Sequence, residues 1–323
     1  MTSPLLDVVV RQRQIQGAAV AVLELERADG APLPAWSAGA HIDLHLGPDL
    51  VRAYSLCGDP TRTGAYRLGV LKDAASRGGS QAVHARLLPG TALRISAPRN
   101  HFPLAAEATH HVLIGGGIGI TPMIAMAWAL HAAGRPFALH YAVRGTAQAA
   151  FLAELATVPW ADWVRVHADD GPAAQKLDAL AVLRAAPAGR HVYVCGPAGF
   201  MDAVLAQARE AGLAPAELHR EYFQAPAQPV PAGGDRAFEL VARRSGKTVT
   251  VAADETPLAA LARIGIRVPV SCQEGVCGTC ACEVIDGTPE HRDAFLTDEE
   301  RAANDQILVC CSRSAGPRLV LDL

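Results

Sequence analysis

The sequence predicts a multidomain chain: an antiparallel β-barrel domain, an α/β domain with a parallel sheet, and a small α+β domain. Three observations carry this prediction. Residues 1–105 contain short strands separated by turns, residues 106–225 alternate strands with helices, and residues 237–323 contain six of the eight cysteines. A chain of 323 residues is long enough for two or three domains, each with its own core.

The barrel is expected over residues 1–105, although a sandwich would show the same spacing of strands. Its strand candidates are short runs of alternating apolar and polar residues, at 20–28, 41–47, 51–58, 65–73 and 91–98. From residue 110 the chain alternates between strands and helices, which is typical of a parallel sheet covered by helices. The strand candidates there are 110–114, 137–143, 163–168, 191–196 and 218–223, and helices are expected at 122–133 and 199–211.

A linker is predicted at residues 226–236, which hold three prolines and two glycines and show no apolar periodicity. Beyond it, strands are expected at 238–242 and 248–253. A helix is expected at 256–265, with Thr256 as its N-cap and Pro257 as its first residue.

The composition excludes several classes of protein. A formal net charge of −3 gives no basic excess for binding nucleic acid. The longest apolar stretch, Ile118 to Ala133, is too short to cross a bilayer, and the N-terminus has no charged segment ahead of an apolar run. We therefore expect a cytoplasmic chain with reduced thiols and no membrane partner.

The cysteines predict an iron–sulfur centre. Their spacing is Cys272-x4-Cys277-x2-Cys280, with Cys310 following after 29 residues, which is the plant-type [2Fe–2S] pattern. There are three competing explanations: a structural zinc site, disulfides, and ordinary buried cysteines. Structural zinc usually takes two separated pairs of ligands. Cys310 is assigned as the fourth ligand with Cys311 as its rival, and Cys282 is expected to be a core thiol. Glycines at 275 and 278 would let the loop turn its N–H groups inward.

Residues 237–323 as a whole resemble a plant-type ferredoxin. The segment "EHRDAFLTDEERAANDQILVCCSR" and the ending "RLVLDL" resemble the C-terminal domain of the phthalate dioxygenase reductase and vanillate O-demethylase reductase family. Within that segment, Thr297 to Glu300 forms a capping box at the start of a short helix.

The stretch "VLIGGGIGITPM" is expected to bind a pyrophosphate, with Thr121 placed as N-cap and Pro122 as the first helical residue. Four glycines would allow close approach of the backbone: Gly115, Gly116, Gly117 and Gly119. The stretch is not the G-x-G-x-x-G fingerprint, because residue 120 is isoleucine. It resembles the GGxGxTP(M) motif of the ferredoxin–NADP reductase superfamily, which implies a pyridine nucleotide; an ordinary strand-to-helix turn would look similar.

Two further segments fit a nucleotide site. "YVCGP", at 193–197, resembles the superfamily's second nicotinamide loop, which implies that Cys195, Gly196 and Pro197 lie near the hydride. A buried thiol at a strand end is the alternative for Cys195. Asp169 and Asp170 lie near the end of a strand, where a carboxylate would accept the ribose hydroxyls and repel a 2′-phosphate, favouring NADH. A solvated turn explains these aspartates equally well.

The flavin site is implied by resemblance to the same superfamily. "RAYSL", at 52–56, resembles its RxYS(L) motif: Arg52 would bind the phosphate, Tyr54 would lie on the isoalloxazine ring and Ser55 would donate near N5. Read alone, this pattern suits any barrel strand. The resemblance implies three further groups of residues at the flavin. Gly78, Gly79 and Ser80 precede a helix and would bind the flavin phosphate, Val70, Leu71 and Lys72 would run along the ring edge, and Phe223 would pack beside the flavin from a strand end. The resemblance favours FMN over FAD.

Together these motifs predict an electron relay from NADH to FMN, to the [2Fe–2S] cluster, and on to the Rieske-type component of an aromatic (phthalate- or vanillate-like) oxygenase. Ser55 and Cys195 are the candidate catalytic residues, because the nicotinamide must meet flavin N5 beside them. A flavin converts two-electron into one-electron transfer. A monomer is expected. Two different functions stay open: a reductase for another acceptor, such as a cytochrome P450, and a ferredoxin-like carrier or sensor.

Overall fold

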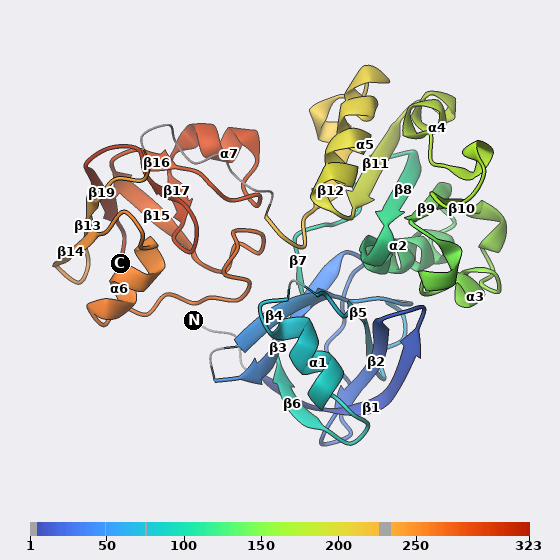
Figure 1. The fold of residues 1–323 in the computed structure, drawn as a ribbon, viewed down its shortest axis with the longest axis horizontal. Coiled ribbons are helices and arrows are strands. Elements are labelled where there is room, and N and C mark those ends of the chain that lie inside the picture. Colours follow the sequence, from blue (N-terminus) through green and yellow to red (C-terminus); the bar gives the residue numbers. More distant parts are fainter. Residues whose placement is uncertain (1–4, 49, 75, 226–233) are drawn as a thin grey trace. The chain divides into compact units, whose positions relative to one another are not determined.

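Seven antiparallel strands form the barrel of the N-terminal region (Figure 1). In this computed structural model residues 5–323 are described, except 49, 75 and 226–233. The hydrogen-bonded strand order is β4-β3-β6-β1-β2-β5, with β7 paired to β3, and a bridge between Leu56 and Leu68 links the end of β4 to β5. The elements are β1 (Leu6–Gln16), β2 (Val20–Arg27), β3 (Ala40–Gly47), β4 (Leu50–Ser55), β5 (Tyr66–Leu71), α1 (Gly79–Arg86), β6 (Ala92–Ile95) and β7 (Arg99–Asn100).

Strand β1 is the longest in the barrel, and it was not among the predicted strands. Its first half buries Val8 and Val10 in the barrel core. Its second half reads "RQRQIQ", with side chains that are exposed or half-buried, so no apolar alternation marks it. Pairing with β2 holds this polar half in the sheet, as the cross-strand register from Arg13–Leu23 to Gln16–Val20 shows.

The α/β region has five parallel strands in the order β10-β9-β8-β11-β12. The chain runs outward from β8 to β10 and then returns to the other side of β8, so the order reverses between β8 and β11. Ligands bind at such a switch point. The elements are β8 (His110–Gly116), α2 (Ile120–Ala132), β9 (Phe137–Val143), α3 (Leu152–Leu155), β10 (Val164–Ala168), α4 (Ala179–Ala185), β11 (Arg190–Cys195), α5 (Ala198–Glu210) and β12 (Leu218–Glu221).

Five short 3₁₀ turns complete this region: η1 (Gly117–Gly119), η2 (Thr146–Gln148), η3 (Ala161–Trp163), η4 (Ala173–Gln175) and η5 (Pro215–Glu217). Two apolar cores cover the sheet. One contains helix α2 with Trp160 and Phe151, and the other contains α4 and α5 with Leu183 and Met201.

Histidine pairs join each edge strand of this sheet to its neighbour. His140 on β9 is 3.0 Å from His167 on β10, and His191 on β11 is 2.9 Å from His219 on β12, measured between ring nitrogens. Burial, and then the neighbouring imidazole, lowers the pKa of His140 and of His219 to about 4. No metal set was expected among the histidines, and these four instead contact one another in pairs.

The C-terminal region has a five-stranded mixed sheet in the order β14-β13-β19-β15-β17 and a two-stranded sheet of β16 and β18. As predicted, Thr256 caps α6 by accepting from the Ala259 N–H, and Thr297 and Glu300 form the capping box of α7. The elements are β13 (Phe238–Ala242), β14 (Lys247–Val251), α6 (Pro257–Arg263), β15 (Ala281–Asp286), β16 (Pro289–Glu290), α7 (Asp298–Ala303), β17 (Gln306–Leu308), β18 (Arg313–Ser314) and β19 (Arg318–Leu321).

These regions form two compact units, residues 5–223 and residues 224–323. The barrel and the parallel sheet share the first unit. Of the predicted linker, residues 226–233 lie outside the described residues, so the domain boundaries stay a prediction. Asp235, near the predicted end of the linker, belongs to the second unit, where its carboxylate pairs with Arg292 and lies 3.8 Å from Arg313. Among the described residues no helix is both long and apolar enough to cross a membrane.

Candidate functional site

The loops that follow β8 and β11 pack backbone against backbone at the switch point of the parallel sheet. A Cβ at Gly119 would lie 2.2 Å from the Cys195 carbonyl oxygen, and a Cβ at Gly116 would lie 2.7 Å from the Phe200 ring. Gly196 is equally confined by Phe200, at 2.9 Å. Gly116, Gly119 and Gly196 are therefore required for the loops to pack together, a reason that the sequence did not suggest.

Gly115 also differs from its predicted role at the pyrophosphate. It lies buried within β8, ahead of the turn, and pairs in register with Cys195 of β11. A Cβ at Gly115 would lie 2.9 Å from Ile120 Cα, the first residue of α2. Gly115 therefore lets the start of the helix pack on its own strand, and this contact by itself requires a glycine there.

Gly117 differs from its neighbours, because it has a φ of +54° and open space where a side chain would be. A left-handed backbone facing open space suits close approach of a ligand. Turn η1 runs from Gly117 directly into α2, and this corrects one prediction. Gly119, not Thr121, is the N-cap, and Thr121 is the second residue of the helix.

Within α2, Thr121 donates from Oγ1 to the Ile118 carbonyl at 3.0 Å. Pro122 is the third residue of the helix rather than the first. It still lies in the first turn, where a missing N–H costs no helical hydrogen bond. The Ile120 N–H donates to the carbonyls of Gly117 and Ile118, and Pro122 has no N–H, so neither residue offers a free N–H to an anion.

The predicted catalytic residues Ser55 and Cys195 both lie near a third residue, Glu221. Ser55 ends β4 of the barrel and donates from Oγ to Glu221 Oε2 at 3.1 Å. Cys195 ends β11, is fully buried, and pairs in register with Glu221 at the end of β12. Burial, and then the nearby Glu221 charge, raises the pKa of the Cys195 thiol, so the thiol stays protonated.

Glu221 is a functional candidate that was not predicted from the sequence. Packing around its carboxyl group raises its pKa to about 7, against the opposing effect of the Ser55 hydrogen bond. A carboxyl group with its pKa raised in this way can accept or release a proton near neutral pH. The available signal was a carboxylate at the carboxyl end of a strand beside the switch point.

Arg52 and the N-terminus of α1, which are predicted to bind a phosphate, lie against each other. Gly78 is the N-cap, with a φ of +88°, and α1 begins at Gly79, so Gly79 and Ser80 lie in the first turn and do not precede the helix as predicted. A Cβ at Gly79 would lie 2.6 Å from Arg52 Cγ, so the arginine stem crosses the helix start. A guanidinium beside free N–H groups suits a phosphate.

Contacts around this start fix its shape. The Arg52 guanidinium donates to the carbonyls of Val51 at 2.8 Å and Arg77 at 2.9 Å, and Ser80 Oγ accepts from the Asp73 N–H at 3.1 Å. Tyr54 is largely enclosed, and burial raises its pKa to about 12. Its phenol is therefore neutral at physiological pH.

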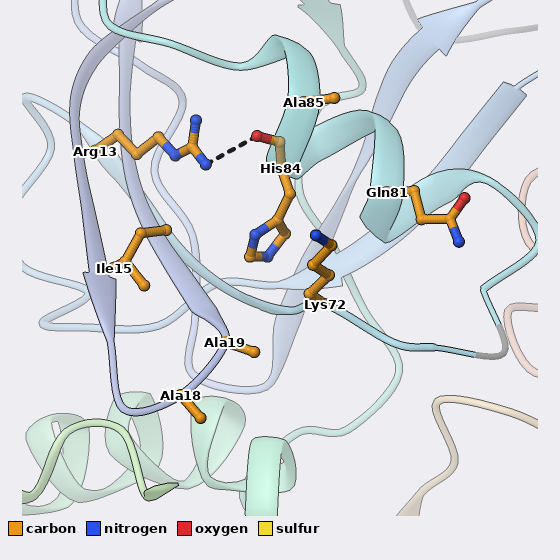
Figure 2. A pocket seen from close by; sticks show the side chains of 8 residues that line it. All are labelled: Arg13, Ile15, Ala18, Ala19, Lys72, Gln81, His84 and Ala85. Atoms are coloured by element: carbon orange, nitrogen blue, oxygen red, sulfur yellow. Dashed lines mark hydrogen bonds between the residues drawn. The ribbon is translucent and has the colours of Figure 1, made fainter.

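Lys72 lines a hollow on the barrel surface, beside the strand predicted to follow the flavin edge. At the end of β5, Val70 is buried and the Leu71 side chain is 41% exposed. Figure 2 shows the hollow, of about 640 Å³, between the β1–β2 hairpin and α1. Arg13 donates to the His84 carbonyl across it at 2.8 Å. Among the described residues no carboxylate lines the hollow; the lining residues are Arg13, Ile15, Ala18, Ala19, Lys72, Gln81, His84 and Ala85.

Asp169 and Asp170 lie at the carboxyl edge of the parallel sheet, where both are exposed. Their N–H groups donate to the carbonyls of Val143 and Arg144, at 3.0 and 3.1 Å, which ties the turn to the end of β9. A Cβ at Gly145 would lie 2.7 Å from Asp170 Oδ2, so the turn and the strand end are closely packed.

The last two predicted cofactor residues of this unit lie at the ends of elements. Phe223, just beyond β12, packs partly buried against the α2 core. Pro197 is the N-cap of α5, which begins at Ala198. Both therefore lie at the edge of the sheet where the β8 and β11 loops meet.

In the second unit the four predicted ligand thiols are all buried and come together in two pairs. Cys272 interacts with Cys277, which lowers the pKa of Cys277 to about 5, and Cys280 interacts with Cys310, which raises the pKa of Cys280. Two thiolates per iron is the arrangement that a [2Fe–2S] cluster needs. Among the described residues no three such ligands converge on one metal ion, as structural zinc would require.

The remaining two cysteines of this unit have different surroundings. Cys282 is a buried core thiol on β15, as expected. Cys311 follows Cys310 in a turn after β17 and is partly exposed. Its Sγ would lie 2.5 Å from a Cβ at Gly275, so it packs on the backbone of the ligand loop. The spacing left Cys311 as a rival ligand, and these contacts favour Cys310.

Both glycines of the ligand loop have a left-handed backbone, with φ of +72° at Gly275 and +70° at Gly278. Each also lacks room for a side chain, because a Cβ would lie 2.9 Å from Asp293 Cα in one case and 2.3 Å from the Phe295 ring in the other. The segment from Asp293 to Phe295 thus closes over the loop. The residues fit the cluster: the four thiols are buried and paired, three of them lie on a loop whose turns require glycine, and the fourth, Cys310, lies in the turn after β17.

Two parts of the chain match known protein families. Residues 241–315 match the 2Fe-2S iron-sulfur cluster binding domain, and residues 93–218 match the dimethylamine monooxygenase subunit DmmA-like N-terminal domain. A vanillate O-demethylase oxidoreductase from Pseudomonas sp. (strain HR199 / DSM 7063) is 48% identical, over 99% of this chain and 100% of that protein.

Two solved structures show the same fold over the length of the chain. Phthalate dioxygenase reductase is 35% identical with a TM-score of 0.75, covering 99% of this chain and 98% of that one. An intact type IV self-sufficient cytochrome P450 monooxygenase is 38% identical with a TM-score of 0.87, and this chain spans 42% of it. The predicted fold, with its barrel, parallel sheet and ferredoxin domain, is confirmed.

Proposed function

Because this chain belongs to the phthalate dioxygenase reductase and vanillate O-demethylase reductase family, we propose that it carries electrons from NADH through FMN and a [2Fe–2S] cluster to a Rieske-type oxygenase. The family makes it an iron–sulfur flavoprotein oxidoreductase that uses a pyridine nucleotide. The choice of NADH, of FMN and of the acceptor is the proposal.

The hydrogen bond from Ser55 to Glu221 is the observation that carries it. This bond joins the strand predicted to hold the flavin to the sheet predicted to hold the nucleotide, with Cys195 beside the same carboxylate. A bound flavin would accept a hydride and release electrons singly. Arg52 and the start of α1 would hold its phosphate, and Tyr54 would cover its ring.

Glu221 is placed to hold a proton next to the reacting atoms. With a pKa of about 7, its carboxyl group can hold or release a proton near neutral pH while accepting the hydrogen bond of the Ser55 hydroxyl at 3.1 Å. The neutral Cys195 thiol and the packed glycine loops lie beside this pair. Asp169 and Asp170 would accept the ribose hydroxyls and repel a 2′-phosphate, which selects NADH over NADPH.

An anaerobic titration of the purified protein with NADH tests the relay. One flavin and one cluster take up about three electrons, so both sets of visible bands should bleach after roughly one and a half equivalents of NADH. Chromatography of the released flavin should give FMN. A protein that holds no flavin, or that bleaches with neither NADH nor NADPH, would leave only an iron–sulfur carrier.

A second acceptor class follows from the self-sufficient P450, in which a segment resembling this chain is part of a P450 monooxygenase. Purified Rieske oxygenase components and purified cytochromes P450 can be mixed in turn with the NADH-reduced protein. Faster reduction of the Rieske centres supports the proposal, and faster reduction of P450 haem supports the second class. Sedimentation velocity tests the expected monomer.

A further inference from the structure

Gly69 lies in the middle of β5 at a place where the barrel meets the nucleotide domain. A Cβ at this position would lie 2.8 Å from Phe151 Cζ and 2.9 Å from Thr121 Cγ2. Gly69 is buried, and its φ is not in the left-handed region. The glycine is therefore required for space and not for backbone freedom.

Phe151 is held at this contact by an unusual backbone and several partners. It is fully buried and has a φ of +64°, which non-glycine residues rarely adopt. Its N–H donates to Gln16 Oε1 of the barrel at 2.9 Å, and the Arg67 guanidinium lies over its ring at 5.4 Å. Arg67 in turn forms a two-pronged ion pair with Glu154 of α3, at 2.7 Å for one of its bonds.

Thr121 approaches Gly69 from the other side with a fixed orientation. Because Oγ1 donates to the Ile118 carbonyl, Cγ2 is left to face the glycine. Thr121 belongs to the predicted nucleotide loop, and Gly69 directly precedes the Val70–Lys72 strand end predicted to follow the flavin edge. One contact thus links the two cofactor sites.

We propose that Gly69, Phe151 and Thr121 form a spacer that sets the separation between nicotinamide and flavin, with Phe151 as a positioning residue. This rests on the proposed function. Strained backbone that persists is held by its surroundings, and here the Gln16 and Arg67–Glu154 contacts hold it. Hydride transfer depends steeply on the separation of the reacting atoms, so a displacement well under 1 Å would slow it.

The test compares Gly69→Ala with Gly47→Ala. Gly47 also lies on a barrel strand, but a Cβ there would be 3.7 Å from its nearest neighbour, an ordinary contact. We expect Gly69→Ala to lower the limiting rate of flavin bleaching by NADH roughly tenfold or more, while the NADH concentration at half the limiting rate changes less than about threefold. Gly47→Ala should leave both values unchanged.

Replacing the Phe151 ring with a smaller side chain should restore the rate that Gly69→Ala loses. In the double variant Gly69→Ala with Phe151→Leu, the shorter side chain makes room, and the limiting rate should recover at least about threefold over Gly69→Ala. The midpoint of thermal unfolding of the flavin-free protein should likewise fall in Gly69→Ala and recover in the double variant. This measurement tests the packing contact independently of hydride transfer. If Gly69→Ala does not fold, Thr121→Ser, which keeps Oγ1 and removes Cγ2, should by itself lower the limiting rate.

Three results would overturn the spacer: wild-type bleaching in Gly69→Ala, no recovery in the double variant, or a loss confined to NADH affinity. Failure of the proposed function gives a different result, because the wild-type protein itself would then not bleach with NADH.

Discussion

The site at the parallel sheet and the ligand loop of the second unit are built in opposite ways. The first joins Ser55, Cys195 and Glu221 from three strand ends, and its central hydrogen bond links residues 166 positions apart. The second draws three of its four candidate ligands from nine consecutive residues, closed over by the Asp293–Phe295 segment. A site built from strand ends depends on how whole sheets pack, whereas a loop site depends on local spacing and a few glycines.

The largest expected effect tests the loop site. Cys310→Ser should abolish the visible iron–sulfur spectrum, because it leaves one iron short of a thiolate. Cys311→Ser is the matched control at the adjacent position and should keep the cluster. Iron and sulfide analysis with the visible spectrum measures both, and loss of the cluster in Cys311→Ser alone would reverse the assignment. Flavin bleaching by NADH should survive in each variant.

The strand-end site should respond more gradually. Glu221→Gln keeps the shape of the side chain but cannot accept a proton, and we expect flavin reduction to slow about a hundredfold near neutral pH. The pH dependence near 7 should disappear with it, since the pKa of about 7 belongs to this carboxyl group. Stopped-flow traces from pH 6 to 9 measure this. A slowed variant that keeps the wild-type pH profile would make Glu221 structural only.

Acid should destabilise the first unit through its histidine pairs. Folding lowers the pKa of His140 to about 4, below its usual value, so the unfolded chain binds the proton more readily. Stability is therefore fully present above about pH 6.5 and declines as pH falls toward 4, by up to about 2 kcal/mol at pH 5. Denaturant unfolding at pH 7 and pH 5 should show a smaller loss in His140→Asn. An equal loss in both proteins would refute the assignment.

The smallest expected effect concerns the second unit alone. Thr297→Ala removes the acceptor for the Glu300 N–H, at 3.1 Å, and should cost about 1 kcal/mol of stability. Thr297→Ser keeps the hydroxyl and should be nearly neutral. Chemical denaturation followed through the iron–sulfur absorbance compares the two. Equal stability of the serine and alanine variants would show that the cap contributes nothing.

The difference between the two sites also explains what could be predicted from the sequence. The ligand spacing, the caps at Thr256 and Thr297 and the strands of the parallel sheet are local patterns, and each was predicted. The contact at Gly69 and the polar half of β1 depend on partners far away in the chain, and no local pattern marks them. Glu221 had one local signal, a carboxylate at a strand end, but its hydrogen bond is to Ser55, 166 positions away. Thr121 was misplaced as an N-cap because a 3₁₀ turn can continue directly into a helix.

The ion pairs of Asp235 determine where the C-terminal unit can be cut from the rest of the chain. Arg292 and Arg313 hold this carboxylate, and Arg313 also donates to the carbonyls of Ala252 and Arg236 at 2.9 and 3.1 Å. The transplantable part of the C-terminal unit therefore begins at Asp235, two residues before the predicted boundary. A fusion protein in which the C-terminal unit begins at residue 237 would leave Arg292 without one of its two carboxylate partners. A fusion that begins at Asp235 would keep this ion pair.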